Sequence, residues 1–282
     1  MTNLPARPVP NQSRALTARL GRSYRVTMSW YAPAPVAPDL SRDLVTGWTA
    51  RAEGRHQLVP DGCVDVLWIA PGAVVVCGPE TTAWDFTLPP RTEAVGVRFR
   101  AGRAGSVLGF HTAETRNLRV RLEDVRGAAV ARRLADQVDA AGHPTARLDT
   151  LQQAVRGWLA DAAPPDPAAL TVRRMLARDI ATPVEAMAEE AGLSERQLHR
   201  RCLEAFGYGP VTLRRILRLQ RFLSLARHPA APRSLAALAA AARYTDQPHL
   251  SRDCRAIAGT SPAALVSDPY TTGEPHMTTL AS

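Results

Sequence analysis

The second half of the chain contains an internal repeat, which limits the folds that this half can adopt. The segment LHRRC at residues 198–202 recurs as LSRDC at residues 250–254, an offset of 52, and a Gly-x-x-Pro follows each copy. Upstream, the apolar positions of residues 184–191 recur in residues 235–242 at an offset of 51. The offset between the copies changes by one residue within a turn, where the second copy contains one extra residue, Thr245. A length change confined to a turn indicates a duplicated structural unit.

Each unit is predicted to be two short helices joined by a tight turn. In the first unit, capping boxes at residues 182–185 and 194–197 start the two helices, and Gly192 suits a left-handed turn between them. In the second unit, Ser234 and Asp246 occupy the corresponding cap positions. Between the units, residues 210–227 are predicted to form one long helix. A rigid connector of this kind suits two DNA readers spaced ~34 Å apart, one turn of B-DNA.

Two short helices joined by a tight turn form the motif that places its second helix in the major groove. The outward faces of the two second helices carry groups that bond to base edges. The predicted base-contacting residues are Arg196, His199, Arg200, Gln247, His249, Ser251 and Arg252. Half or more of protein–DNA hydrogen bonds go to the backbone, so four other basic residues of this region are assigned to phosphates or solvent. They are Arg201, Arg214, Arg218 and Arg221.

Charge supports a polyanionic partner. Residues 196–233 contain nine Arg and one acid, a local balance of +8, whereas the whole chain has 35 basic residues, all of them Arg, against 26 acids. An Arg-only, Ala-rich composition is also typical of a GC-rich genome. The local concentration is therefore the stronger electrostatic indication of nucleic-acid binding.

The residues of the two units resemble the AraC/XylS family of bacterial transcription regulators. The matching text is LSERQLHRRCLEAFGYGPVTLRRILRLQRFL followed by SLAALAAAARYTDQPHLSRDCRAIAGTSPAAL, within residues 168–267. The resemblance implies that the chain reads double-stranded DNA through the outward faces of both second helices, with RNA polymerase as an expected further partner. Two features depart from the family. Arg243 stands at a turn position where Gly is usual, and Cys202 and Cys254 stand where Phe is usual.

The first half differs in character. Short β-branched or aromatic runs at residues 24–29, 64–69, 73–77 and 94–99 indicate strands, and residues 122–140 and 147–160 show helical spacing. The Pro-rich string at residues 163–167 ends this half. The expected fold class is α+β, with a β-rich, cupin-like N-terminal barrel and trailing helices before an all-α domain of two helix-turn-helix motifs joined by a long helix. The expected domains are a disordered tail (1–23), a sensor and dimerisation domain (24–163), a linker (164–167), the DNA-binding domain (168–268) and a flexible tail (269–282).

The segments LVPDGCVDVLW, CGPET and VGVRFRAG resemble a sensor-like domain attached to some AraC-type regulators. The resemblance implies a small-molecule effector of unspecified identity and a homodimer. The candidate pocket residues are Trp48, Asp61, Cys63, Asp65, Trp68, Trp84 and Arg98. The competing explanation is structural, because a turn that feeds a strand and an aromatic core produce the same pattern.

Several function classes are disfavoured. Four Cys without C-x-x-C spacing favour reduced thiols, and residues 1–22 lack the apolar core of a signal peptide, so a cytoplasmic protein without membrane contact is expected. With no H-x-H and no paired Cys in the first half, we expect no metal, no cofactor and no catalytic residues. The alternatives are a ligand-independent regulator, a cupin-type metalloenzyme and a DNA alkyl-transfer protein fused to the same motifs. Activation and repression both fit this interpretation.

Overall fold

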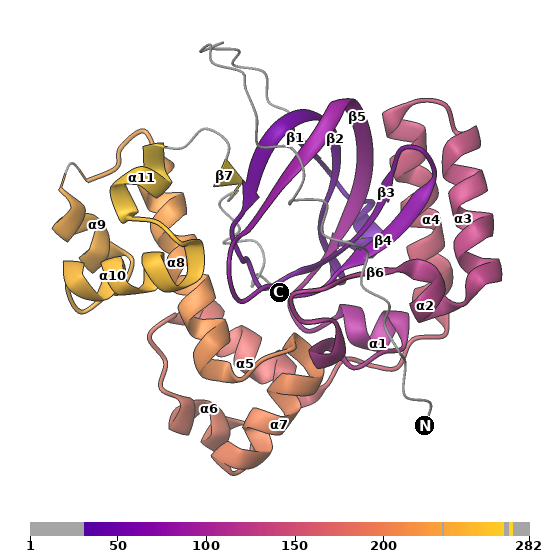
Figure 1. Cartoon of the computed structure of the whole chain (residues 1–282). Helices are drawn as coiled ribbons and strands as arrows, with labels where there is room; N and C mark the ends of the chain where they lie inside the picture. Colours follow the sequence, from indigo (N-terminus) through magenta and orange to yellow (C-terminus); the bar gives the residue numbers. More distant parts are fainter. Residues whose placement is uncertain (1–30, 233, 268–270, 273–282) are drawn as a thin grey trace.

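The computed structural model describes residues 31–232, 234–267 and 271–272 (Figure 1). The strand predicted at residues 24–29, the tail 1–23 and most of the tail 269–282 lie outside the described residues. Two residues of the second tail form a short strand. The α+β class is confirmed: an antiparallel sheet with helices on one side precedes an all-helical half.

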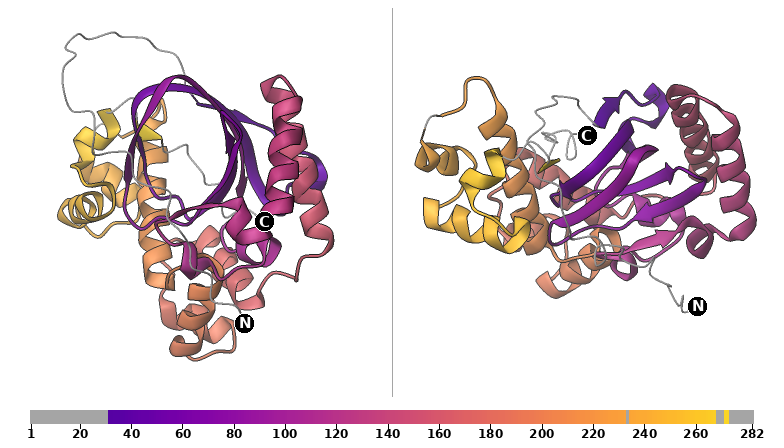
Figure 2. Two further views of the ribbon diagram at one scale, coloured as in Figure 1. Left: turned by 45° about the vertical axis from the view of Figure 1, so that its right-hand side comes forward. Right: turned by 45° about the horizontal axis from the view of Figure 1, so that its top comes forward.

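The described part of the first half is built on one curved sheet with the strand order β1-β2-β5-β3-β4-β6 (Figure 2). Neighbouring strands along this order are antiparallel, and β7 adds to β2 in parallel. Strands β3 and β4 have the predicted bounds, but β2 is a long strand that the sequence analysis missed. The strands are β1 (Tyr31–Ala34), β2 (Leu44–Leu58), β3 (Val64–Ile69), β4 (Ala73–Cys77), β5 (Trp84–Phe99), β6 (Arg119–Arg121) and β7 (Thr271–Thr272).

The two faces of the sheet have different environments. Along β3, Val64, Val66 and Trp68 are buried, while the alternate residues are half-buried. The buried face packs on the helices that follow the sheet, where Leu148 and Leu151 join the same core. We call the opposite side the concave face. The helices are α1 (Ala104–Leu108), α2 (Leu122–Arg126), α3 (Ala128–Ala140) and α4 (Pro144–Ala160), with 3₁₀ turns at Pro38–Leu40 and Thr112–Thr115.

The second half contains the two predicted units. We call residues 167–208 the first head, residues 234–267 the second head, and α8 the connector. The helices of the second half are α5 (Pro167–Arg178), α6 (Val184–Glu190), α7 (Glu195–Phe206), α8 (Pro210–Arg227), α9 (Leu235–Ala241), α10 (Gln247–Asp253) and α11 (Pro262–Ser267), with a π-helical turn at Cys254–Ala258. The capping box at Ser194 and the caps at Ser234 and Asp246 are confirmed. The capping box predicted at Thr182 is wrong. Pro183 takes the cap position, and the Thr182 hydroxyl donates to the Asp179 carbonyl at 2.6 Å.

Each head packs on its own part of the connector. Leu213 and Ile216 join the core of the first head, and Phe222 and Leu223 join the core of the second head. Cys202 and Cys254 are completely buried at corresponding positions of α7 and the second head. Burial raises the pKa of both thiols to about 12, so they are protonated core groups.

The first half packs against both heads, a contact we call the seam. Ala101 belongs to the core of the first head, and Val59 belongs to the core of the second head. Gln220 of the connector donates through Nε2 to the Pro60 carbonyl at 2.7 Å. Gly207 fits tightly here, because a Cβ at this position would lie 2.6 Å from Cγ of Pro79. The predicted linker is therefore a short connection between packed parts, and its last residue, Pro167, already begins α5.

None of the described helices is both long and apolar enough to cross a bilayer. Within the same residues, no group of three or more His, Cys, Asp or Glu side chains is arranged to hold a metal ion.

Candidate nucleic-acid interface

Helix α7 presents the predicted reading face of the first head. Ser194 and Gln197 form a reciprocal capping box, with the Ser194 N–H donating to Gln197 Oε1 at 2.9 Å. The buried positions of α7 fall on one face, and the three predicted base-contacting residues Arg196, His199 and Arg200 are exposed. The His199 ring lies against Gly209, where an added Cβ would be 2.5 Å from its Cδ2. The exposed face of α7 therefore offers two guanidinium groups and an imidazole to a groove.

Helix α10 presents the corresponding face of the second head. The Asp246 carboxylate caps it by accepting the His249 N–H at 2.6 Å. Gln247 and Arg252 are exposed, whereas Ser251 and His249 are half-buried. The His249 Nε2 lies 3.0 Å from Nη2 of Arg218, and burial together with that guanidinium lowers the imidazole pKa. His249 is therefore directed towards the connector, and we no longer assign it to base contact.

The arginines assigned to phosphates have protein partners. Arg214 donates through Nη1 to the Thr182 carbonyl at 2.8 Å, and Arg221 donates through Nε to the Ala241 carbonyl at 3.1 Å. Arg218 is 11% exposed and donates to the buried Asp253 carboxylate at 3.0 Å. The assignment of these three residues to phosphates is corrected, because their guanidinium groups tie the connector to the heads.

Two further arginines of this region pair with acidic side chains. Arg215 donates through Nε to Asp253 Oδ1 at 3.0 Å, so that carboxylate has two basic partners. Arg201 pairs with Asp166 at 3.2 Å and keeps about half of its side chain exposed, with a relative accessibility of 46%. Of the four predicted phosphate contacts, Arg201 alone keeps that assignment.

On the concave face, four predicted pocket residues come together around one guanidinium. Arg98 pairs with Asp65 at 2.8 Å and with Asp61 at 3.0 Å, and Trp48 donates through Nε1 to Asp65 at 3.2 Å. Tyr31, which the sequence analysis missed, lies beside Trp48 with ring centroids 5.6 Å apart. Tyr31 lies in β1, a strand that the sequence did not predict, so no sequence signal placed Tyr31 on this face.

The other three predicted pocket residues are placed differently. Trp68 lies on the helix-covered face, because it is three residues from Asp65 and neighbouring side chains of a strand alternate. It is removed from the predicted pocket. Cys63 is buried in the turn before β3, where its N–H donates to Asp61. Trp84 packs against the guanidinium of Arg119 at 3.5 Å from the ring centroid.

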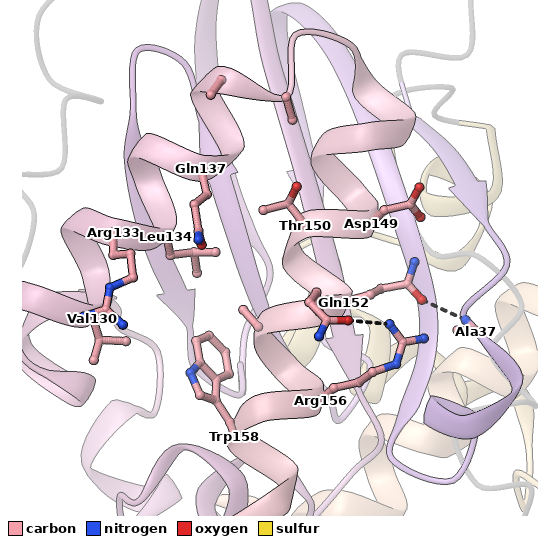
Figure 3. Close-up of a pocket in the computed structure, with 14 residues that line it drawn as sticks. Ala37, Val130, Arg133, Leu134, Gln137, Asp149, Thr150, Gln152, Arg156 and Trp158 are labelled. Carbon is pink, nitrogen blue, oxygen red and sulfur yellow. Dashed lines mark hydrogen bonds between the residues drawn. The ribbon is translucent and has the colours of Figure 1, made fainter.

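A groove also lies between α3 and α4 (Figure 3), and none of the seven predicted pocket residues lines it. Leu134, Trp158 and Arg156 are among its lining residues, and Arg156 also pairs with Asp39. The sequence predicts these helices but not the groove between them.

Glu80 provides a pH-dependent element beside the concave face. Its carboxylate lies 2.6 Å from Nη2 of Arg119. Burial raises the pKa of Glu80 from 4.5 to about 7, the Arg119 guanidinium opposes that rise, and the Asp61 carboxylate adds to it. A raised carboxyl pKa means that the folded protein binds the proton more tightly than the unfolded chain. The stabilising contribution of the protonated group is therefore present below about pH 4.5 and is lost as the pH rises to about 7.

Replacing Glu80 with Gln is expected to remove this component of the pH dependence. Between pH 5 and pH 8 the melting temperature of the wild type should fall by a few °C more than that of Glu80→Gln. Differential scanning fluorimetry across that range measures both slopes. Parallel slopes would show that Glu80 titrates normally in the folded protein.

Comparison with known proteins agrees with this geometry. A helix-turn-helix domain family matches residues 187–267, and a domain of unknown function, DUF6597, matches residues 31–121. No curated protein matches the chain. Among solved structures, ToxT from Vibrio cholerae at 1.65 Å aligns with a TM-score of 0.45 and 10% identity over 78% of this chain and 97% of that chain. A fatty-acid-bound ToxT from strain SCE256 aligns with a TM-score of 0.42 and 12% identity over 86% and 97%.

The fold and the two heads define a chain that carries a helix-turn-helix domain, matched over residues 187–267. More particularly, this helix-turn-helix domain follows a DUF6597 domain, matched over residues 31–121.

Proposed function

We propose that this protein is a sequence-specific transcription regulator whose two heads read adjacent major-groove segments of one duplex. The observation that carries the proposal is the pair of repeated heads on one helix, each with an exposed polar face on its second helix. The base-contacting residues in this proposal are Arg196, His199, Arg200, Gln247, Ser251 and Arg252. Arg and Gln have the geometry for bidentate bonds to guanine and adenine.

The second part of the proposal is that a small molecule bound at the concave face controls DNA binding. Arg98 links this face to Asp61, whose Oδ1 accepts the Cys63 N–H at 2.9 Å. The same loop reaches the connector through the bond between Pro60 and Gln220. A ligand that displaced Asp61 from Arg98 would therefore move a loop that touches the helix carrying both heads. A ligand shifts this equilibrium only by its difference in affinity for the two arrangements.

Further partners complete the proposal. A regulator of this kind acts in the cytoplasm, where it meets DNA and RNA polymerase, and it forms a homodimer through the first half. Light scattering on the purified full chain measures the mass: twice the chain mass supports the dimer, and the chain mass at all concentrations contradicts it.

The proposed function is tested by selection from random-sequence DNA with the full-length protein at moderate ionic strength. Recovery of one sequence with two conserved segments is the expected result, and recovery of unrelated sequences would contradict the proposal. Thermal shift with a metabolite panel tests the sensor, because a ligand of the native state raises the melting temperature. If no metabolite raises it, the ligand-independent regulator replaces the sensor.

Replacing Gln220 with Leu is expected to weaken the seam. Gln220 is 3% exposed, and its amide also lies 3.4 Å from the Val59 carbonyl, so the substitution leaves two loop carbonyls without this donor. Leaving such groups unpaired costs about 1–3 kcal/mol and should lower the melting temperature by several °C. Thermal unfolding measures the loss. Gln153→Leu, at an exposed position of α4, is the matched control, and equal melting temperatures for both variants would argue against the seam contact.

A further inference from the structure

The turns of the two heads share a backbone conformation but not a residue type. Gly192 in the first head has φ 66°, and Arg243, the corresponding residue of the second head, has φ 67°. This left-handed conformation is unfavourable for any residue with a Cβ. A Cβ at Gly192 would meet nothing within 4 Å, so local space does not explain the difference between the heads. The backbone cost at Arg243 points to a use for its side chain.

The side chain of Arg243 reaches the first head. Its Nη2 donates to Asp179 Oδ2 at 2.9 Å, and its Nε donates to Asp179 Oδ1 at 3.4 Å. Two parallel bonds between a guanidinium and a carboxylate fix orientation as well as distance. The heads are therefore joined directly, in addition to their separate packing on the connector.

Asp179 is held in place as an acceptor. It lies in the turn between α5 and α6, where its Oδ1 accepts the Ala181 N–H at 3.0 Å and its carbonyl accepts the Thr182 hydroxyl. The Ala181 N–H and the Arg243 guanidinium lower the pKa of Asp179, so it is ionised at neutral pH.

The connector holds the same two turns. Arg214 binds the Thr182 carbonyl beside Asp179, and Arg221 binds the Ala241 carbonyl at the end of α9, two residues before Arg243. The first head, the connector and the second head thus form a closed ring of contacts. Rotation of one head relative to the other would break the bond between Arg243 and Asp179.

We propose that Asp179 and Arg243 form a clasp that fixes the rotation and distance between the two heads and so determines which half-site spacing the protein accepts. The proposal rests on the proposed DNA-reading function. Inserting one base pair between half-sites moves them apart by ~3.4 Å and turns them by about 35°. A protein with fixed heads discriminates against the insertion, and a protein with looser heads discriminates less.

The test uses the full-length protein and the bipartite duplex recovered by selection, with and without one inserted base pair. Asp179→Asn and Arg243→Gln each remove the ion pair, and both should lower the ratio of the two affinities about two- to five-fold, as loss of one exposed ion pair allows. Arg178→Gln, an exposed arginine next to Asp179, is the control for charge and should leave the ratio unchanged. An unchanged ratio in both clasp variants would overturn the proposal.

Because the two partners carry opposite charges, DNA binding by the two single variants distinguishes a clasp from a contact between Arg243 and a phosphate. If Arg243 contacts a phosphate, Arg243→Gln should weaken binding to every duplex and reduce the salt slope by about one, whereas Asp179→Asn should not weaken it. That result would also overturn the clasp. A wild-type protein that selects no sequence would instead contradict the proposed function itself.

A third variant separates the clasp from folding. Arg243→Gly suits the left-handed turn, so it should raise or preserve the melting temperature while it lowers the spacing ratio as Arg243→Gln does. The exchanged pair Asp179→Arg with Arg243→Asp should restore part of the ratio, because Asp tolerates the left-handed region. Failure of Arg243→Gly to change the ratio would count against the clasp.

Discussion

Replacing Arg218 with Met is expected to lower the free energy of unfolding by about 2–3 kcal/mol, because it breaks a buried ion pair. The Asp253 side chain is 5% exposed and Arg218 is 11% exposed, and the guanidinium also lies 4.5 Å from the Tyr244 ring centroid. Arg215 still pairs with Asp253 in this variant. The loss of unfolding free energy is therefore smaller than for a buried carboxylate left without any basic partner. Thermal unfolding should show a melting temperature lower by about 5–10 °C.

The control for Arg218→Met is Arg255→Met, at an exposed position of the second head, which also contains Asp253. It removes the same charge and should leave the melting temperature nearly unchanged. A folded, equally stable Arg218→Met protein with a smaller salt slope of DNA binding would show that Arg218 contacts a phosphate after all.

Replacing Arg200 with Ala is expected to cost about 1–3 kcal/mol of specific binding, or about five- to 150-fold in affinity, and to relax the preference at one base pair. Arg200 is exposed on α7, on the side opposite the buried Leu198 and Cys202. Fluorescence anisotropy with the selected duplex and with its single-base variants measures both effects.

Arg201→Ala is the matched control for Arg200→Ala. Its side chain pairs with Asp166 and points away from the proposed base-reading face, so it should weaken all duplexes by a similar, smaller factor. Equal losses on selected and scrambled DNA for Arg200→Ala would show that Arg200 does not read a base.

The helical half follows closely from the sequence because its signals are local. Ser194 and Asp246 accept bonds from N–H groups within their own first turns, and Gly192 takes the left-handed turn predicted for it. Arg243 takes the same conformation although it is not glycine. The bounds of the connector, Pro210–Arg227, are also those predicted. Thr182 shows the limit of such signals: its hydroxyl has a competing acceptor, the Asp179 carbonyl, three residues earlier.

The roles of the connector arginines do not follow from the sequence. The spacing of Arg214, Arg218 and Arg221 shows that they share a face of a helix, but it does not show what packs on that face. Their partners lie 20 to 35 residues away and two of them are backbone carbonyls. The spacing of these arginines therefore predicts that they lie on one face of the helix, and it does not predict that they contact phosphates.

The concave face and the seam are set by long-range contacts. Trp68 was expected in the pocket from its residue type, but the alternation of β3 places it on the helix-covered face. The seam is formed by small residues such as Ala101 and Gly207 and by backbone carbonyls, which carry no pattern. A Pro-rich linker predicts where the chain divides, and it does not predict how closely the two parts pack.

Methylation interference on the selected duplex tests the central proposal most directly, because guanine N7 lies in the major groove where the two heads are expected to bind. We expect two clusters of interfering positions about one helical turn apart on the same side of the duplex. A single cluster, two clusters on opposite sides of the duplex, or no interference would contradict it.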